Sequence, residues 1–130
     1  MFDQGIGDVF NVRLAGNVVD EEVLGSLEFA TKAAGAALVA IIGHSGCGAV
    51  IGAVDGVEMG HLTGLLDRIE PAVAAAAHHC PGCGSDTPGF VDACIEENVR
   101  WQLRYAVDNS PILRSLVEEK RIRLVGGVHD

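Results

Sequence analysis

A histidine and a cysteine lie three residues apart in the stretch GHSGCGAV, at His44 and Cys47. Imidazole and thiolate are the side chains that zinc binds best. Gly43, Gly46 and Gly48 allow the backbone to turn sharply and leave room beside an ion. These glycines could instead cradle a phosphate at a helix start, although the Lys and Ser/Thr of a P-loop are missing. We refer to His44 and Cys47 as the His–Cys pair, which by itself is either half of a zinc site or a turn that happens to contain these two side chains.

A second group of metal-binding side chains lies in the stretch HHCPGC, where Cys80 and Cys83 follow two histidines. Three interpretations stay open at this point. Either cysteine could complete the site begun by the His–Cys pair, or both could hold a second, structural zinc ion. The third interpretation is a solvent-exposed loop whose thiols do nothing. A further alternative is that the His–Cys pairs of two subunits form one four-ligand site across a two-fold axis.

The elements that must position these residues alternate between strands and helices. Residues 8–15 alternate apolar and polar side chains and predict a strand, and 20–35 predict a helix with acids in its first turn. Residues 36–43 form a continuous apolar run, which is typical of a strand buried on both faces of a parallel sheet. The remaining predictions are helices starting at Cys47 and over 61–80, 90–110 and 112–120, and a strand over 121–130. Pro71 either kinks the helix over 61–80 or opens its second segment.

This alternation predicts an α/β protein: a three-layer, mainly parallel β-sheet flanked by helices. Such sheets bind ligands beyond the carboxyl ends of their strands, which is where the His–Cys pair follows residues 36–43. The length of 130 residues predicts a single domain over 1–130. Cys94 falls inside a helix and is expected to be a small core side chain.

The composition argues against several classes of partner. The formal net charge is −9, and the nine Lys and Arg residues form no cluster, so nucleic acid and anionic membrane surfaces are not expected partners. The longest apolar run is about half of a membrane span, and the start has no basic, apolar leader. Four cysteines without such a leader indicate free thiols in a reducing compartment. We therefore expect a cytoplasmic protein.

Five stretches together resemble the β-class carbonic anhydrases, in the same order and at suitable spacing: FDQGIGDVFNVRLAGNVVDEEVLGSLEFA, LVAIIGHSGCGAV, ENVRWQL, SPILRSLVEE and LVGGVHD. The resemblance implies zinc (Zn2+) held by a Cys, a His and a second Cys, of which the last two match His44 and Cys47. It implies reversible hydration of CO2 to bicarbonate by a homodimer or higher oligomer. Arg13 and Asn17 match the family's R-x-A-G-N segment, first as structural support and second as anion contacts.

The family's remaining zinc ligand lies in a Cys-x-Asp-x-Arg motif, on a central strand upstream of a stretch like FDQG. In this chain the FDQG stretch begins at Phe2. We therefore expect an incomplete site, with the third ligand supplied by Cys80 or Cys83, by another chain or by an upstream segment. Without the central strand, residues 8–15 would pair with residues 36–43, or a neighbouring subunit would fill the gap. The alternative function is a catalytically inactive, shortened relative that acts as a structural or regulatory oligomerisation module.

Overall fold

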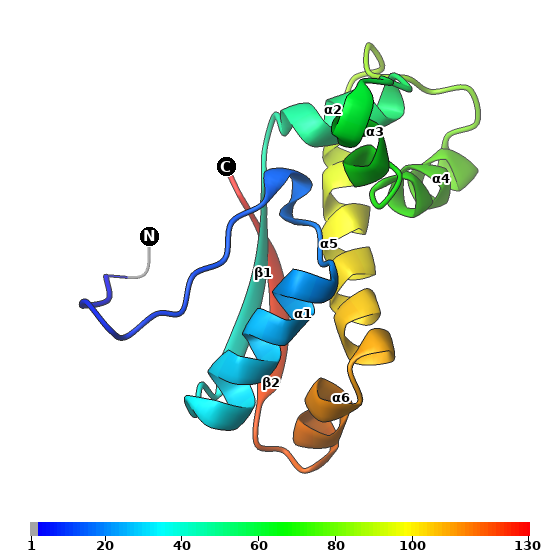
Figure 1. Ribbon diagram of the computed structural model, residues 1–130. Coiled ribbons are helices and arrows are strands. Elements are labelled where there is room, and N and C mark those ends of the chain that lie inside the picture. The colour runs from blue at the N-terminus through cyan, green and yellow to red at the C-terminus, as the bar shows by residue number, and fades with distance from the viewer. Residues whose placement is uncertain (1–2) are drawn as a thin grey trace.

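The core of the fold is a pair of parallel strands, β1 (Leu38–His44) and β2 (Arg123–His129). The computed structural model describes residues 3–130, and in it β1 pairs with β2 from Leu38–Arg123 at one end to His44–His129 at the other. Figure 1 shows the two strands lying side by side although they come from distant parts of the sequence. Strands over 36–43 and 121–130 were predicted from the sequence, and both are confirmed.

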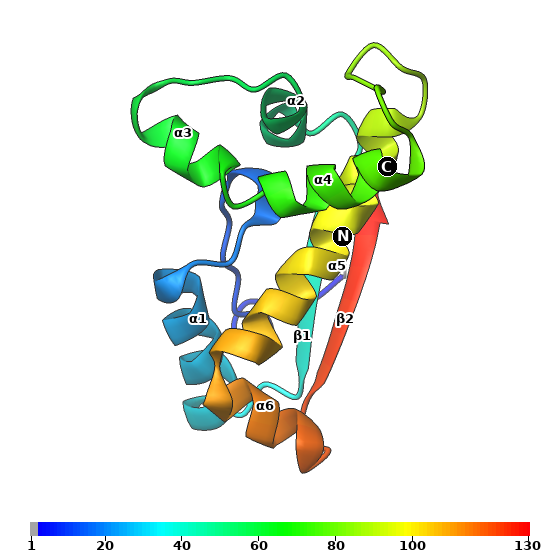
Figure 2. The same cartoon turned by 90° about the vertical axis from the view of Figure 1, so that its right-hand side faces the viewer.

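The helices follow the predicted order, except that one predicted helix is divided into two. The helix expected over 61–80 is two helices, because Pro71 lies in the first turn of the second one, where a missing N–H costs no helical hydrogen bond. Figure 2 shows α5 lying across the two strands. The bounds are η1 (Ala15–Asn17), α1 (Glu21–Glu28), the π-helical turn η2 (Phe29–Ala33), α2 (Gly48–Val54), α3 (Gly60–Leu66), α4 (Glu70–His79), α5 (Phe90–Asn109) and α6 (Pro111–Glu118).

The helices cover one face of the sheet. In β1 the side chains that face α5 are buried, whereas the alternate positions Leu38, Ala40 and His44 are exposed. The α/β fold with helices flanking a parallel sheet is confirmed, but the prediction that β1 is buried on both faces is wrong for residues 3–130. The reason is that no described element lies over the second face. On the covered face, Val23 and Leu24 of α1 pack with residues of β1, α5 and α6.

Residues 8–14 do not form the predicted strand. They are exposed and form an extended segment that leads away from the strands without joining the sheet, as Figure 1 shows. The ring of Phe10 lies 6.1 Å from that of Phe29, centre to centre, which holds the segment against the end of α1. Alternating apolar residues form a strand only when a neighbouring strand accepts their backbone hydrogen bonds, and no described strand pairs with these residues. The expected pairing of residues 8–15 with residues 36–43 is therefore wrong in this chain.

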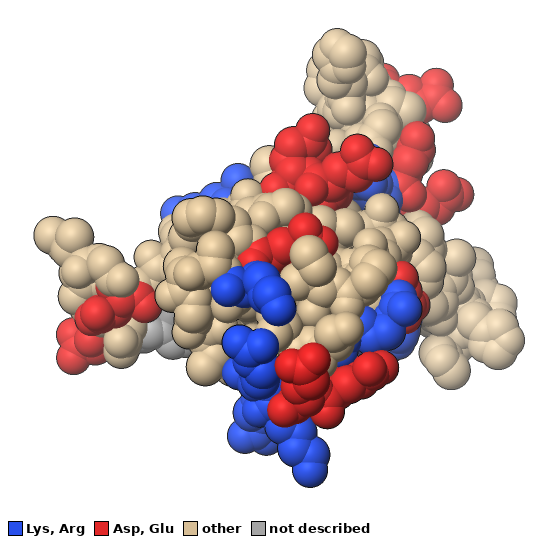
Figure 3. Space-filling view, turned by 60° about the horizontal axis from the view of Figure 1, so that its bottom comes forward, with Lys and Arg blue, Asp and Glu red and all other residues tan. Residues whose placement is uncertain are grey.

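Charged side chains of both signs are mixed on the surface. On the face in Figure 3, Lys and Arg side chains lie among Asp and Glu side chains rather than forming one basic surface. None of the helices within residues 3–130 combines the length and the apolar character that crossing a membrane requires.

Ser110 links the start of α6 to the last residue of α1. Its side chain is fully buried, donates a hydrogen bond to Glu28 Oε1 at 2.7 Å and accepts one from the Leu113 N–H at 3.1 Å. We expect Ser110→Ala to lower the free energy of unfolding by about 1–2 kcal/mol, because α6 loses its N-cap and the Glu28 carboxylate loses a donor. Urea unfolding followed by circular dichroism measures this loss.

The matched control for that measurement is Ser26→Ala. Ser26 also donates a hydrogen bond, to Glu22 O at 2.8 Å, but this bond is exposed to solvent on α1. Its replacement is expected to change the free energy of unfolding by less than about 0.5 kcal/mol. Equal effects of the two substitutions would contradict the role assigned to Ser110.

Candidate metal centre

His44 is the last residue of β1, and its ring is oriented by the backbone. Its Nδ1 lies 2.9 Å from the carbonyl oxygen of Ser45. Because a carbonyl oxygen only accepts hydrogen bonds, the ring must carry a proton on Nδ1, and in the neutral ring Nε2 then keeps its lone pair. Metal-binding histidines are held in this way, with one ring nitrogen donating to a carbonyl and the other facing the metal.

Cys47 lies just before α2, at the N-cap position of that helix. It is a free thiol with only 3% of its surface exposed, and it packs with Val18, Val50 and Ile69 in one of the two core clusters. The strand end and the helix start therefore position the two members of the His–Cys pair on either side of one short turn. Gly46 lies in that turn and Gly48 opens α2. The predicted location at the carboxyl end of β1 is confirmed.

The carboxamide of Asn17 lies beside the end of β1. A Cβ atom on Gly43 would stand 2.9 Å from Val99 Cγ2 and 3.5 Å from Asn17 Oδ1. Glycine, which has no Cβ atom, therefore fits this position of β1 best. Asn17 Nδ2 is buried and has no hydrogen-bond partner within the described part of the chain. Arg13, by contrast, is exposed on the extended segment. Of the two residues predicted as support or anion contacts, the structure brings only Asn17 to the site.

Cys80 and Cys83 are joined in a disulfide. The expectation of free thiols is wrong for these two residues, because their spacing in a tight turn brings the sulfurs together as readily for a bond as for a shared metal ion. A sulfur in a disulfide has no thiolate to offer a metal, so their role as zinc ligands stays a prediction for the reduced chain. Within residues 3–130 no three His, Cys, Asp or Glu side chains are grouped so that they could hold a metal ion.

Cys94 is fully buried in α5, as predicted for a core side chain. Burial raises the pKa of its thiol, because the thiolate would lose its contact with water. The side chain therefore stays a neutral, small core group rather than a metal ligand or nucleophile.

A buried polar network on α5 was not identified from the sequence. Gln102 Oε1 accepts a hydrogen bond from the Val19 N–H at 2.8 Å, and its Nε2 donates to Asn98 Oδ1 at 3.0 Å and to Arg68 O at 3.3 Å. Asn98 Nδ2 in turn donates to Gly16 O at 2.7 Å. The network fixes the backbone on both sides of Asn17. Its sequence signal was two amides four residues apart on an otherwise apolar helix face.

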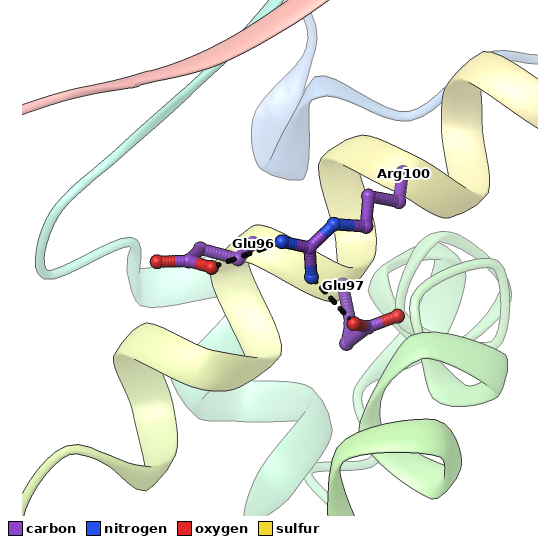
Figure 4. Close-up of polar contacts among 3 residues, drawn as sticks. All are labelled: Glu96, Glu97 and Arg100. Carbon is purple, nitrogen blue, oxygen red and sulfur yellow. Dashed lines mark hydrogen bonds and ion pairs between the residues drawn. The ribbon is translucent and has the colours of Figure 1, made fainter.

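Acidic residues on the opposite side of α5 form surface ion pairs rather than an acid–base site. Arg100 contacts Glu97 at 2.6 Å and Glu96 at 3.3 Å, as Figure 4 shows. The hydrogen bond from Arg100 to Glu97 raises the pKa of the guanidinium further above its usual value. All three side chains keep contact with solvent, so these pairs are solvated helix charges.

Several proteins of known function are similar in sequence to this chain over part of their length. A family model described as carbonic anhydrase matches residues 1–130. Carbonic anhydrase 2 of Mycobacterium tuberculosis is 42% identical over 78 residues, which cover 56% of this chain and 38% of that protein. Carbonic anhydrase 1 of Escherichia coli O157:H7 is 33% identical over 125 residues, covering 92% of this chain and 57% of that protein. The matches thus span about two fifths to three fifths of these relatives' lengths.

The backbone is also similar to solved structures. Among them is a structure of tetrameric β-carbonic anhydrases from the filamentous ascomycete Sordaria macrospora, with a TM-score of 0.83 and 25% sequence identity. The aligned region covers 95% of this chain and 64% of that one. The similarity therefore extends over nearly all of the strands and helices described above.

Proposed function

The chain belongs to the carbonic anhydrase family and has the fold of its β-class members, and from that premise we propose that it binds zinc through His44 and Cys47. The proposed activity is the reversible hydration of CO2 to bicarbonate once a third ligand is supplied. The observation that supports the zinc site most is the orientation of His44, whose Nδ1–H donates to Ser45 O and leaves Nε2 free for an ion.

The donor set fits zinc in type. One neutral imidazole and one thiolate are two of the three protein ligands that catalytic zinc sites use. Zinc bound at such a site lowers the pKa of water to about 7 and so supplies the nucleophile for CO2 hydration. Asn17 Nδ2, a buried donor without a protein partner in the described residues, is suited to contact an anionic product such as bicarbonate.

We propose that the third ligand arrives on an extended segment that pairs with the free edge of β1. β1 is hydrogen-bonded to β2 alone in the described sheet, and the extended residues 8–14 pair with neither strand. A strand inserted parallel to β1 would end next to His44 and could deliver a side chain there. Its source is a part of the protein outside residues 3–130 or a second copy of the chain.

The alternative function is an oligomerisation module without catalysis. It is favoured by the exposed apolar face of the sheet, where Leu38 keeps 58% and Val125 keeps 41% of its surface in contact with solvent. A face of this kind is commonly covered by another chain. In either case we propose a homo-oligomer, in line with the tetrameric relatives from Sordaria macrospora, and a cytoplasmic location.

The test is the zinc content of the chain with its Cys80–Cys83 disulfide intact, compared with Cys47→Ser. We expect the wild-type chain to retain zinc through dialysis and the variant to bind it at least about tenfold more weakly, because a hydroxyl replaces a thiolate. The matched control is Cys94→Ala, which removes a buried thiol from α5 and should keep the metal. A stopped-flow CO2 hydration assay on the same samples separates the two functions.

Each outcome of this test has a definite meaning. About one zinc ion per chain with CO2 hydration supports the enzyme, and zinc without hydration supports the module. About half an ion per chain supports a closed site shared across a two-fold axis. Zinc that persists unchanged in Cys47→Ser, or no zinc in the folded wild-type chain, overturns the proposed site.

A further inference from the structure

The segment from His78 to Cys83 concentrates four metal-binding side chains in six residues at the end of α4. The helix ends at His79, and Cys80 is its C-cap, with its N–H donating to Ala77 O at 3.2 Å. The chain then turns back on itself, and the Cys83 N–H donates to Cys80 O at 3.1 Å. We call residues 78–83 the His–Cys turn. Its backbone is closed by this hydrogen bond as well as by the disulfide.

The two imidazoles of the His–Cys turn are close together and exposed. The ring centres of His78 and His79 lie 5.4 Å apart, with the rings nearly perpendicular. Two imidazoles bound to one tetrahedral zinc ion have their ring centres roughly 5 Å apart, since each zinc–nitrogen bond is about 2.0–2.1 Å. The spacing observed between the two rings is therefore already close to the spacing that a shared ion requires.

Cys80 and Cys83 follow the two histidines in the same turn, and their sulfurs can form either of two kinds of bond. Two cysteines separated by two residues in a turn are the usual half of a structural zinc site, in which both thiolates bind one ion. In the oxidised chain each sulfur is bonded to the other instead, and a disulfide sulfur is not a zinc ligand. In this oxidised state no group of three His, Cys, Asp or Glu side chains within residues 3–130 could hold a metal ion.

We propose that the His–Cys turn is a redox-controlled zinc site, separate from the His–Cys pair at the end of β1. Oxidised, it is held by the Cys80–Cys83 disulfide and takes no metal. Reduced, it offers two thiolates and two imidazoles, the Cys2His2 set of structural zinc sites, and binds one Zn2+. The bound ion then replaces the disulfide, keeping the turn closed between α4 and the loop before α5.

The switch is a two-electron reaction with a dithiol as reductant. One thiolate of the dithiol attacks a disulfide sulfur, the S–S bond breaks, and the second thiol of the reductant resolves the mixed disulfide. The reductant leaves as its own disulfide, and Cys80 and Cys83 each end with one proton. Zinc then displaces these two protons as it binds the thiolates, so metal uptake by the turn releases acid and weakens at low pH.

Cys80 and Cys83 also connect this site to the rest of the core. Both are partly buried and pack against the cluster that contains Cys47, Val50 and Phe90. The two cysteines of the turn therefore pack against the core, whereas its two imidazoles are exposed to solvent. An ion can therefore reach the imidazoles from solvent without unfolding the chain.

The experiment compares zinc uptake by oxidised and reduced chain. The wild-type protein is reduced with a water-soluble trialkylphosphine, which takes up one oxygen from water to become the phosphine oxide while the disulfide gains two hydrogens. The phosphine is removed under argon, and zinc per chain is measured with a chromophoric chelator. We expect the reduced chain to hold about one zinc ion more than the oxidised chain. Because the His–Cys pair is present in both samples, the difference reports on the two thiols that reduction releases, and the histidine variant below tells whether the ion lies in the turn.

Two variants and a second metal identify the ligands. The double variant Cys80→Ser, Cys83→Ser should show no difference between the two conditions, and His78→Ala, His79→Ala should bind the extra ion at least about tenfold more weakly. Cobalt(II) added to the reduced wild-type chain should give thiolate-to-metal absorption and the intense visible bands of a tetrahedral ion. Circular dichroism checks that each variant is folded.

The proposal is overturned if reduction adds no zinc to the folded wild-type chain, or if the extra ion persists in the double serine variant. Unchanged affinity in the double alanine variant overturns the assignment of the imidazoles. These failures differ from a failure of the proposed carbonic anhydrase site, which is measured in the oxidised chain with Cys47→Ser.

Discussion

Replacing Gln102 with leucine is expected to lower the free energy of unfolding by about 2–4 kcal/mol. The side chain is 1% exposed and makes three hydrogen bonds, to the Val19 N–H, the Asn98 carboxamide and Arg68 O. Leucine fills nearly the same volume, so the main cost is the buried Val19 N–H and Asn98 oxygen left without partners. An unpaired buried group costs about 1–3 kcal/mol, whereas a hydrogen bond exchanged with water costs much less.

Urea unfolding at equilibrium measures this effect, and Asn109→Ala is the matched control. Asn109 lies on the same helix and donates to Tyr105 O at 2.9 Å, but it is exposed. Water can replace its hydrogen bond, so we expect a change below about 0.5 kcal/mol. A loss of similar size in both variants would show that burial of the amide is not what makes Gln102 important.

Gly16→Ala is expected to have a comparable effect, about 2–4 kcal/mol, for two additive reasons. The backbone at Gly16 has φ +66° and ψ 17°, in the left-handed region that costs alanine about 1–2 kcal/mol. A Cβ atom there would also stand 2.5 Å from Ile69 Cδ1 and 3.3 Å from Ala49 Cβ. Ile69 is fully buried and cannot move away without disturbing its neighbours, so crowding adds to the backbone strain.

Gly35→Ala separates the two causes. Gly35 has φ +80°, but a Cβ atom added there meets nothing within 4 Å. It should show only the backbone strain, and the difference between the two variants measures the crowding of Ile69. In Gly16→Ala the displaced Asn17 should also weaken zinc or bicarbonate binding at the end of β1, whereas Gly35→Ala should not. Equal destabilisation by the two substitutions would contradict the packing argument.

The parts of the fold that sequence reasoning found are those determined by local pattern. Residues 36–43 are apolar throughout and end in a glycine-rich turn, which predicted both β1 and the location of the His–Cys pair at its carboxyl end. Pro71 predicted either a kink or the start of a second segment, and the structure has the second, because proline is tolerated in the first turn of a helix and hardly elsewhere. In each case the residues themselves restrict the backbone.

The parts that it missed depend on residues far away in the sequence. Residues 8–14 alternate apolar and polar side chains as a strand does. A strand forms only beside another strand that accepts its hydrogen bonds, and the alternation does not show whether such a partner is present. Gln102 is an ordinary helix residue until the Val19 N–H is brought beside it. The spacing of Cys80 and Cys83 is equally suited to a disulfide and to a metal, and the sequence does not specify the redox state.

The pairing of β1 with β2 has a consequence for the order in which the chain folds. The sheet joins Leu38 to Arg123, so its first strand is synthesised long before its second. Until then the apolar β1 segment leaves the ribosome without the strand that it pairs with in the sheet. Long-range parallel contacts of this kind form slowly, and an exposed strand is prone to pair with another unfinished chain. Chaperones that recognise short apolar segments would therefore find residues 38–44 accessible until the second strand has been made.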